Sequence, residues 1–487
     1  MKPRELVRAS LILFLVFPFL FLLTQFRLQE WPEWAEVFWA FKNSFYQAFL
    51  SAVFSLVIGA VAALGLISYK AHAKKPVRVL LEVLCLVPNF LPPIFILLAV
   101  LNVIEPFPMG VLGIAIVHTV INYGLVAVLI AGLIEAKFGR YIEVAFIEGS
   151  TRWQFYREVL FPLLKKDLLL IGLFVFVVCF GSFSIPLIVG GARGTTVEVL
   201  IYEKIRLSSD WGGAVLLAFL QSIFIFAISF IAQKGKSSPA TSIANMDLIK
   251  WPAGVVVIGL ISLLYIGGYA EGLFEGIQFI SSFYEIQSAL WWNFFGSLTI
   301  GITVGLLCYG GLLLIAYSFP KKWFEQFLNG YVAPSTSLAC FCLLLIGPNG
   351  GVWTFIKIPL ALTLLSLNSL YRMGWDGSLE SLRSQISVAR TLGASPELIF
   401  KEILFPQITK RAGLLAGIAS IWACGDFAVS RILAHRDISI AMMTETLMSG
   451  YRLNQAILLS SLIIVAALIC FVFIIGVSRV LGRKSLS

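Results

Sequence analysis

Charged residues are scarce in this 487-residue sequence, where they make up 13% of the chain, whereas 59% of residues are hydrophobic. The mean hydropathy is correspondingly high, at +0.92. Ordinary soluble domains carry about 25% charged residues, which cover the folded surface and are solvated by water. The composition therefore argues against a water-soluble globular protein and indicates a chain that folds in a membrane.

Residues that bind metals are also few. The sequence has three histidines, which lie far apart, and seven cysteines, all within apolar runs. Only Cys340 and Cys342 show a short paired spacing, and buried small hydrophobic residues explain the cysteines better than disulfides or metal ligands do. We therefore expect no metal site and no cofactor bound by this chain. The histidines are His72, His118 and His435.

Long apolar runs are abundant, and we count about twelve that reach the roughly 20 residues needed to cross a bilayer as a helix. The first, Ser10 to Phe26, follows the basic residues Lys2, Arg4 and Arg8, as the apolar part of a secretory signal would. No small-x-small cleavage site follows it, so we interpret it as a retained anchor. The predicted fold class is all-α, a polytopic membrane protein.

The net charge of +10 is distributed unevenly along the chain. Lysines and arginines gather in alternate loops, which is the positive-inside pattern of membrane proteins and places both termini in the cytoplasm. This distribution indicates membrane lipid as the surrounding partner and argues against nucleic acid. The basic segments are the N-terminus and residues 70–78, 137–166, 234–250, 321–322, 372–411 and 479–484.

A polar stretch near the middle divides the chain into two halves of about six spans each. We predict an N-terminal half at 1-235, a cytoplasmic linker at 236-250 and a C-terminal half at 251-487. The two halves repeat each other without a gap at a spacing of 244 residues, as Glu143 to Ile185 and Ser387 to Val429. An even number of spans separates the copies, so the halves are predicted to be parallel repeats.

Several positions of this repeat are identical and are polar, glycine or proline, which shared hydrophobicity does not explain. These pairs include Gly149 with Gly393, Glu158 with Glu402, Pro162 with Pro406, Lys166 with Lys410, and Gly181 with Gly425. The repeated loops lie within residues 135-166 and 373-411, on the basic side of the membrane.

Local chemistry predicts a helix, a sharp turn and a second helix in each loop. Gly149 and Gly393 permit the positive φ that ends the first helix. Thr151 with Gln154 has the capping-box spacing, and Ser395 can cap the second helix with Pro396 at its first position. Pro162 and Pro406 follow where each loop meets the membrane.

The two loops resemble the EAA loop of ABC-importer permeases, which has a Glu-Ala-Ala start, a glycine six residues after the glutamate and an Ile-x-Leu-Pro-like end. The matching residues are Glu143, Val144, Ala145, Gly149, Val159, Phe161 and Pro162, then Ser387, Val388, Ala389, Gly393, Ile403, Phe405 and Pro406. The second copy departs from the pattern because Ser387 stands where the family has glutamate.

This resemblance implies the type I ABC-importer permease fold and alternating access. It also implies two cytoplasmic ATP-binding subunits that supply the energy and an external solute-binding protein that delivers the solute. The chain itself would be no enzyme. The residues that the resemblance assigns to ATPase coupling are Glu143, Ala145, Gly149, Pro162, Ala389, Gly393, Ser395 and Pro406.

The fusion of two halves in one chain is similar to the iron(III) and thiamine importer branch of this family. Two segments expected on the outer side, Gly190 to Tyr202 and Leu447 to Arg452, resemble parts of thiamine permeases. The resemblance favours thiamine or iron(III) as the solute.

Asp426 lies within the eleventh expected span, where a carboxylate is energetically costly and usually faces a polar cavity or a partner. It could line the outer part of the pathway and attract a cation. Alternatively, it forms hydrogen bonds between helices or caps a helix end, which is the more frequent role.

Two other classes of function remain as alternatives. A proton-coupled secondary transporter also has twelve spans in two parallel halves, but it predicts paired acids and bases within the membrane, and His118 has no acidic partner nearby in sequence. A membrane enzyme would need a catalytic constellation, which the loops lack. Gly235-Lys236-Ser237 is no P-loop, because Phe230 stands where the first glycine should be.

Overall fold

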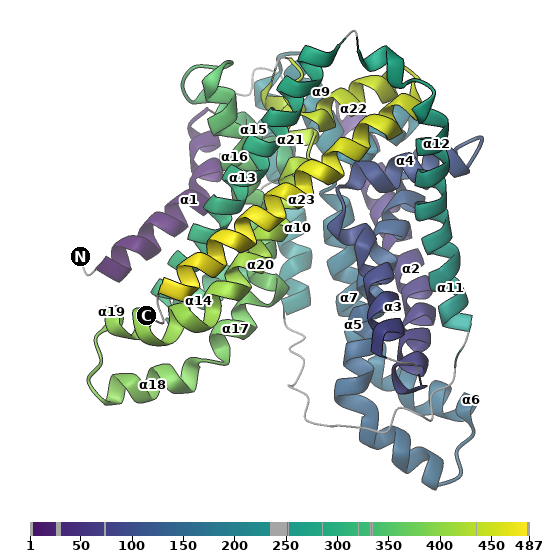
Figure 1. The fold of residues 1–487 in the computed structure, drawn as a ribbon, viewed down its shortest axis with the longest axis vertical. Helices are drawn as coiled ribbons and strands as arrows, with labels where there is room; N and C mark the ends of the chain where they lie inside the picture. Colours follow the sequence, from purple (N-terminus) through teal and green to yellow (C-terminus); the bar gives the residue numbers. More distant parts are fainter. Residues whose placement is uncertain are drawn as a thin grey trace. The chain divides into compact units, whose positions relative to one another are not determined.

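The computed structural model describes residues 3–25, 31–72, 75–233 and 251–484, except for residues 252, 285, 320, 332, 334 and 435. The predicted linker at 236-250 and His435 lie outside the described residues. All regular elements in the described part are helices, which confirms the all-α fold class. The described residues form two compact units (Figure 1).

The first unit comprises residues 32–200 and 223–275. Its long helix α2 packs along α5, and α3 and α7 pack against the same pair. Its elements are α2 (Trp34–His72), α3 (Lys75–Phe90), α4 (Pro93–Val103), α5 (Val111–Ile147), α6 (Arg152–Gln154), η1 (Phe155–Leu160), α7 (Phe161–Phe180), α8 (Ser184–Val189), η2 (Gly191–Arg193), α11 (Ala253–Ser262) and η4 (Leu263–Gly267).

The second unit comprises residues 1–31, 201–222 and 276–487. Helices α13, α20 and α23 form its centre and pack on one another. Its elements are α1 (Pro3–Gln25), η5 (Ile280–Phe283), α13 (Gln287–Ser318), α14 (Lys322–Gly330), α15 (Thr336–Leu345), α16 (Val352–Leu370), η6 (Tyr371–Trp375), α17 (Asp376–Glu380), α18 (Arg383–Thr391), α19 (Pro396–Leu398), η7 (Ile399–Leu404), α20 (Phe405–Cys424), α21 (Ala428–Leu433), α22 (Ile440–Ser449) and α23 (Leu453–Lys484). Helices α9 (Val197–Arg206), α10 (Trp211–Gln233) and α12 (Gly268–Ile277) have residues in both units.

The compact units are not the continuous stretches 1-235 and 251-487, because each takes the first helix of the other stretch. Helix α1 packs against α13 and α15, as Figure 1 shows for the purple helix beside the green ones. The Tyr331 hydroxyl donates to the Leu15 carbonyl of α1 at 2.9 Å. Helix α11 packs on α2, where Gly254 and Gly65 meet so closely that a Cβ on Gly254 would lie 2.5 Å from the Gly65 nitrogen.

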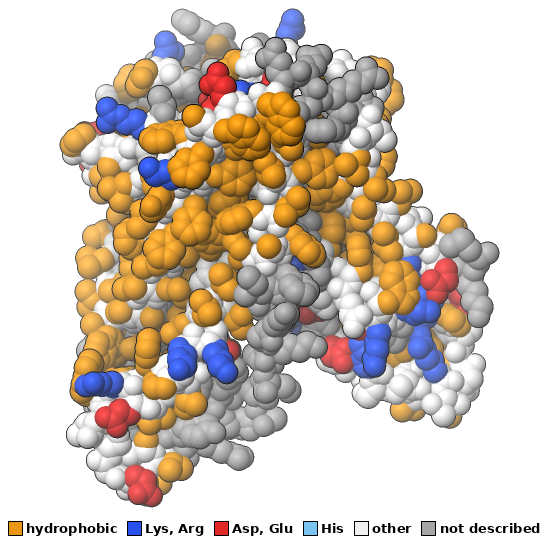
Figure 2. Space-filling model, turned by 180° about the vertical axis from the view of Figure 1, so that it is seen from behind, with side chains coloured by type: hydrophobic (Ala, Val, Ile, Leu, Met, Phe, Trp, Pro, Cys, Tyr) orange, Lys and Arg blue, Asp and Glu red, His pale blue; other side chains and the backbone are white. Residues whose placement is uncertain are grey.

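Seven helices of the described chain are long and apolar enough to cross a membrane, and the bent pair Pro76–Phe90 and Pro93–Val103 makes an eighth if it is one span. The pair turns through 101° beside Pro92, whose ring fixes the backbone and lacks a donor. The other expected crossings fall on α1, α7, α15 and α20, which are helical as well. Figure 2 shows many hydrophobic side chains gathered on the visible face, as expected for helices that face lipid.

Candidate functional site

The two repeated loops fold into the same sequence of elements at the same spacing. In the first loop, α6 leads through the π-helical η1 into α7, and in the second, α19 leads through the π-helical η7 into α20. Segment η1 begins at Phe155 and η7 at Ile399, while α7 and α20 begin at Phe161 and Phe405, each pair 244 residues apart. The sequence repeat is therefore also a structural repeat.

The glycine of each loop ends the preceding helix in the left-handed conformation, with a φ of +79° at Gly149 and +81° at Gly393. The residue after each glycine donates its backbone N–H five residues back. Ser150 donates to the Ala145 carbonyl at 2.9 Å, and Ala394 donates to the Ala389 carbonyl at 3.0 Å. This bond defines a Schellman motif, and it confirms the sharp turn predicted at both positions.

The second helix of each loop begins with a side-chain cap, as predicted. The Gln154 carboxamide oxygen accepts from the Thr151 N–H at 2.9 Å, and the Gln154 N–H donates to the Thr151 hydroxyl at 3.3 Å. In the second loop, the Leu398 N–H donates to the Ser395 hydroxyl at 3.2 Å, and Pro396 follows at the first helical position. Different residues thus satisfy the same free N–H groups of a helix start.

The π-helical turn lies directly before the proline of each loop. Phe161 donates its N–H to the Tyr156 carbonyl, and Phe405 donates to the Phe400 carbonyl, each five residues back. Pro162 and Pro406 then lie in the first turn of α7 and α20, where proline's missing N–H removes one bond of the preceding α-helical ladder. A wider π-helical turn accommodates that loss. The sequence analysis placed these prolines where each loop meets the membrane, but it did not predict the π-helical turns before them.

Each loop also exposes large apolar side chains on its surface. Ile147 is 82% exposed and Leu392 is 81% exposed. Lysines and arginines lie in the same segments of sequence, so these groups are on the side that the charge pattern assigns to the cytoplasm. Exposed apolar groups of this kind are typical of a surface that binds a partner. Other such residues are Val144, Trp153, Val388 and Leu398.

The first residues of the EAA-like pattern differ in how they are placed. Glu143 lies in the last part of α5, and its side chain is outside the described part of the structure. The Ser387 hydroxyl donates to the Ser384 carbonyl within α18 at 2.9 Å. Serine at this position therefore bonds to its own helix.

The approach to the second loop contains a break that the sequence analysis missed. Helix α5 runs without interruption into the first loop, but the corresponding stretch of the second unit bends at η6, where Gly374 has a φ of +105°. After the bend, Arg383 forms ion pairs with Glu325 at 2.6 Å and Glu380 at 2.7 Å. The hydrogen bonds that Arg383 donates to the carboxylates of Glu380 and Glu325 raise the pKa of its guanidinium, which therefore stays charged.

Asp426 lies between α20 and α21, directly after the end of α20. Its carboxylate accepts the Val429 N–H at 2.8 Å, so it caps the start of α21. This geometry fits the capping role that the sequence analysis left open. The attraction of a cation by Asp426 stays a prediction.

His118, the other polar residue considered within a span, is buried at 3% exposure in the first unit. Its Nδ1 lies 3.1 Å from the Gln47 carboxamide oxygen, and the Gln47 amide nitrogen donates to the Cys179 carbonyl at 2.7 Å. These bonds join three helices of the unit, which fits the structural role expected for a lone histidine.

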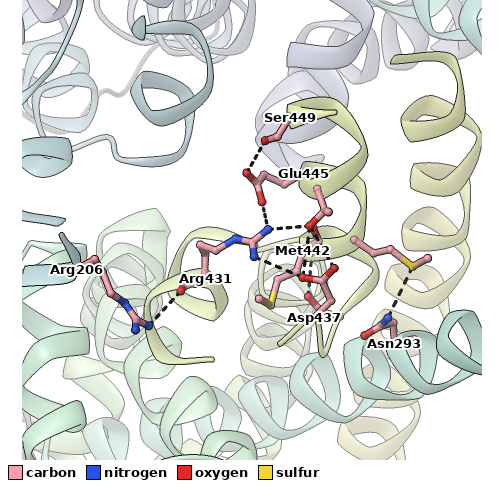
Figure 3. A network of polar contacts seen from close by, with 10 residues as sticks. Arg206, Asn293, Arg431, Asp437, Met442, Glu445 and Ser449 are labelled. Atoms are coloured by element: carbon pink, nitrogen blue, oxygen red, sulfur yellow. Dashed lines mark hydrogen bonds and ion pairs between the residues drawn. The ribbon is translucent and has the colours of Figure 1, made fainter. Parts of the chain in front are cut away.

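A network of charged residues links α21 and α22 in the second unit, as Figure 3 shows. Arg431 pairs with Glu445, and its guanidinium lies 3.5 Å from Asp437 and 2.9 Å from the Thr446 hydroxyl. The Arg206 guanidinium donates to the Ile432 carbonyl beside it. Sequence reasoning missed this network, because its acidic and basic members are separated by loops.

Helices α9 and α22, which overlap the two segments that resemble thiamine permeases, each begin with a backbone N–H that donates to a serine hydroxyl. The Val197 N–H at the start of α9 donates to the Ser44 hydroxyl at 2.9 Å, and the Ile440 N–H at the start of α22 donates to the Ser297 hydroxyl at 2.9 Å. In the second segment, Tyr451 has a φ of +57° and is 98% exposed. A side chain so exposed makes little contact with the rest of the described chain.

Comparison with known proteins supports the resemblance of the loops. Residues 55–235 match the family described as "Binding-protein-dependent transport system inner membrane component". This range contains the first loop but not the second. No solved structure gives a significant match.

Similar proteins include three thiamine transport system permease proteins named ThiP. The protein of Escherichia coli (strain K12) is 23% identical over 494 residues, which cover 91% of this chain and 88% of the relative. That of Salmonella typhimurium is 25% identical over 304 residues, covering 56% of this chain and 55% of the relative. That of Brucella suis is 33% identical over 129 residues, covering 26% and 24%.

The family match covers the first half, the internal repeat extends the same loop to the second, and the similarity to one relative runs over nearly the whole chain. The protein is therefore a multi-pass inner-membrane protein, and its residues 55–235 belong to the inner membrane components of binding-protein-dependent transport systems.

Proposed function

We propose that this permease carries thiamine inward by alternating access, driven by two cytoplasmic ATP-binding subunits. The observation that carries the proposal is the pair of matched loops, each with a left-handed glycine, a helix cap and exposed apolar residues. A linker between spans has no need of such a repeated surface. Docking of one ATP-binding subunit on each loop would bury those apolar groups.

Thiamine is favoured over iron(III) because the similar proteins include several whose names state thiamine transport. The outer segments at residues 190–202 and 447–452 would meet an external solute-binding protein. Both chain termini would lie in the cytoplasm, as the positive-inside pattern predicts. Under this assignment the chain itself hydrolyses no ATP.

The test is uptake in proteoliposomes that contain this chain with its ATP-binding subunits, supplied with the binding protein outside and ATP inside. We expect uptake of labelled thiamine that stops without ATP and persists when the proton gradient is collapsed. Uptake by the chain alone that follows a proton gradient would instead identify a secondary transporter. Uptake of iron(III) but not thiamine would contradict the solute assignment and leave the ABC mechanism intact.

A further inference from the structure

We call the repeated loops at residues 135–166 and 373–411 the first and second coupling loops. Helix α1 contacts the second coupling loop, although α1 belongs to the first half of the sequence. Both belong to the second unit. Arg4 is 8% exposed, and its guanidinium donates to the Pro396 carbonyl of α19 at 2.8 Å. A buried guanidinium is retained where it has partners, and here the partner is the backbone of the loop itself.

An aromatic contact adds to this hydrogen bond. The Arg4 guanidinium lies 5.2 Å from the centre of the Tyr317 ring, within the range of a cation–π interaction. Tyr317 in turn packs its ring edge-on against Phe400 of η7 at 5.4 Å, and its hydroxyl lies 3.4 Å from a Glu397 carboxylate oxygen. Arg4 therefore holds the loop directly at Pro396 and indirectly through Tyr317.

Arg8, one helical turn later, fixes the position from which Arg4 acts. Its guanidinium donates twice to the Ser318 carbonyl at the end of α13, at 3.1 and 2.6 Å, and it pairs with Glu5 at 2.6 Å. Glu5 also lies 3.5 Å from Lys321. These contacts attach the start of α1 to α13, so α19 cannot move away from α13 without breaking the bond to Arg4.

The first loop has an aromatic contact at the equivalent position. Tyr156 and Phe400 are 244 residues apart in the repeat, and Tyr156 meets the edge of Trp251 at 5.7 Å within the first unit. Trp251 directly precedes α11, and its N–H donates to the Ser68 hydroxyl of α2 at 2.7 Å. In the second unit, Arg4 of α1 thus contacts the second loop, and in the first unit, Trp251 before α11 contacts the first loop. Each of these helices comes from the other half of the sequence.

We propose that Arg4 and Trp251 are positioning residues that hold the second and first coupling loops, respectively. This proposal rests on the proposed function, in which the coupling loops bind the ATP-binding subunits. It links each coupling loop to a helix from the opposite half of the chain. A movement imposed on either loop by an ATP-binding subunit would then be passed to both halves of the sequence.

The direct test is amide hydrogen exchange of the full chain alone in lipid nanodiscs, in which each loop serves as the control for the other. Arg4→Ala should speed exchange at residues 397–404 about tenfold, the effect of losing one charge-assisted hydrogen bond, and leave residues 152–160 unchanged. Trp251→Ala should give the reverse pattern. Unchanged exchange in the targeted loop, or equal acceleration in both loops, would overturn the proposal.

Arg4→Ala also removes an N-terminal positive charge and could impair membrane insertion, so Tyr317 provides an independent test. Tyr317→Ala should speed exchange in the second loop, whereas Tyr317→Phe keeps the ring for Arg4 and Phe400 and should restore slow exchange. Arg479→Ala, at an exposed arginine of α23, is the matched control and should change neither loop. Equal exchange in the Ala and Phe variants of Tyr317 would contradict the aromatic link.

In the reconstituted transporter, Arg4→Ala should lower the amount of solute moved per ATP severalfold while ATP hydrolysis continues. Arg479→Ala should keep the wild-type ratio. A wild-type ratio in the Arg4 variant would show that the contact does not serve coupling. Absence of ATP-driven uptake in the wild-type complex would overturn the proposed function alone, since hydrogen exchange tests the contact without any ATP-binding subunit.

Discussion

Gly149 and Gly393 are the residues on which the shape of the two repeated loops depends most directly. Both have a φ near +80°, and among the described residues no atom beyond the chain neighbours lies within 4 Å of a Cβ added at either position. A substitution there would therefore be disfavoured by backbone strain and not by steric contact. The strain for an L-residue in this region is about 1–2 kcal/mol.

We expect Gly393→Ala to raise the free energy of the folded turn by about 1 kcal/mol and to reduce coupled uptake. Gly393→Pro should uncouple transport from hydrolysis, because proline cannot adopt this φ and removes the N–H that donates to the Arg390 carbonyl at 3.0 Å. Gly149→Pro should have the same effect, because proline cannot adopt the φ of +79° found at Gly149. The measurement is uptake per ATP in proteoliposomes.

Gly132→Ala is the matched control for Gly393→Ala, since Gly132 lies inside α5 without a positive φ, and in the described part of the chain no atom outside its own helix backbone lies within 4 Å of an added Cβ. Alanine favours the helix there by about 1 kcal/mol. Wild-type coupling in both proline variants would sink the assignment of these loops as coupling elements.

Asp426 allows a second prediction at the residue scale. Because its carboxylate caps α21 through the Val429 N–H, Asp426→Asn should retain most uptake, since an asparagine side chain also caps a helix. Asp426→Ala should lose the cap and about 1 kcal/mol of stability. Uptake and thermal unfolding of both variants distinguish the roles. Loss of uptake in a well-folded Asn variant would indicate that the negative charge itself acts in the pathway.

At the scale of elements, α21 and α22 are held together by the charge network shown in Figure 3. The Arg431 side chain is 26% exposed and that of Glu445 is 13% exposed, so the pair is only partly screened by solvent. A double-mutant cycle with Arg431→Met and Glu445→Gln should give a coupling energy of about 1 kcal/mol in thermal or denaturant unfolding.

If the network also orders the outer segment at residues 447–452, the same variants should weaken binding of the external protein. The control is Arg479→Met, which changes an exposed arginine of α23 outside both the network and that segment. A coupling energy near zero would mean that α21 and α22 are held by apolar packing alone.

At the scale of the whole molecule, the main feature is that each half of the sequence contributes its first helix to the unit formed mainly by the other half. Helix α11 belongs by sequence to the second half, but Gly254 seats it on α2 of the first unit. Gly254→Leu should therefore destabilise the first unit, since even a Cβ would lie 2.2 Å from the Val61 carbonyl oxygen.

We expect this overpacking to cost about 1–3 kcal/mol and to speed amide exchange in α2. Gly259→Leu on the same helix is the matched control, because no described atom outside its own helix backbone lies within 4 Å of a Cβ at that position. Faster amide hydrogen exchange limited to the second unit would contradict the assignment of α11 to the first unit.

The sequence by itself determined the helical fold, the membrane setting, the repeat and the turns at Gly149 and Gly393. These features follow from composition or from chemistry within a few residues, such as a left-handed glycine followed by a cap. Only the tertiary structure decided which unit receives α1 and α11, and it also revealed the contact of Arg4 with Pro396, the Arg431 network and the bend at Gly374. These depend on close packing between segments far apart in the chain, or on a backbone change that propensity does not specify, so the residue pattern gives no direct sign of them.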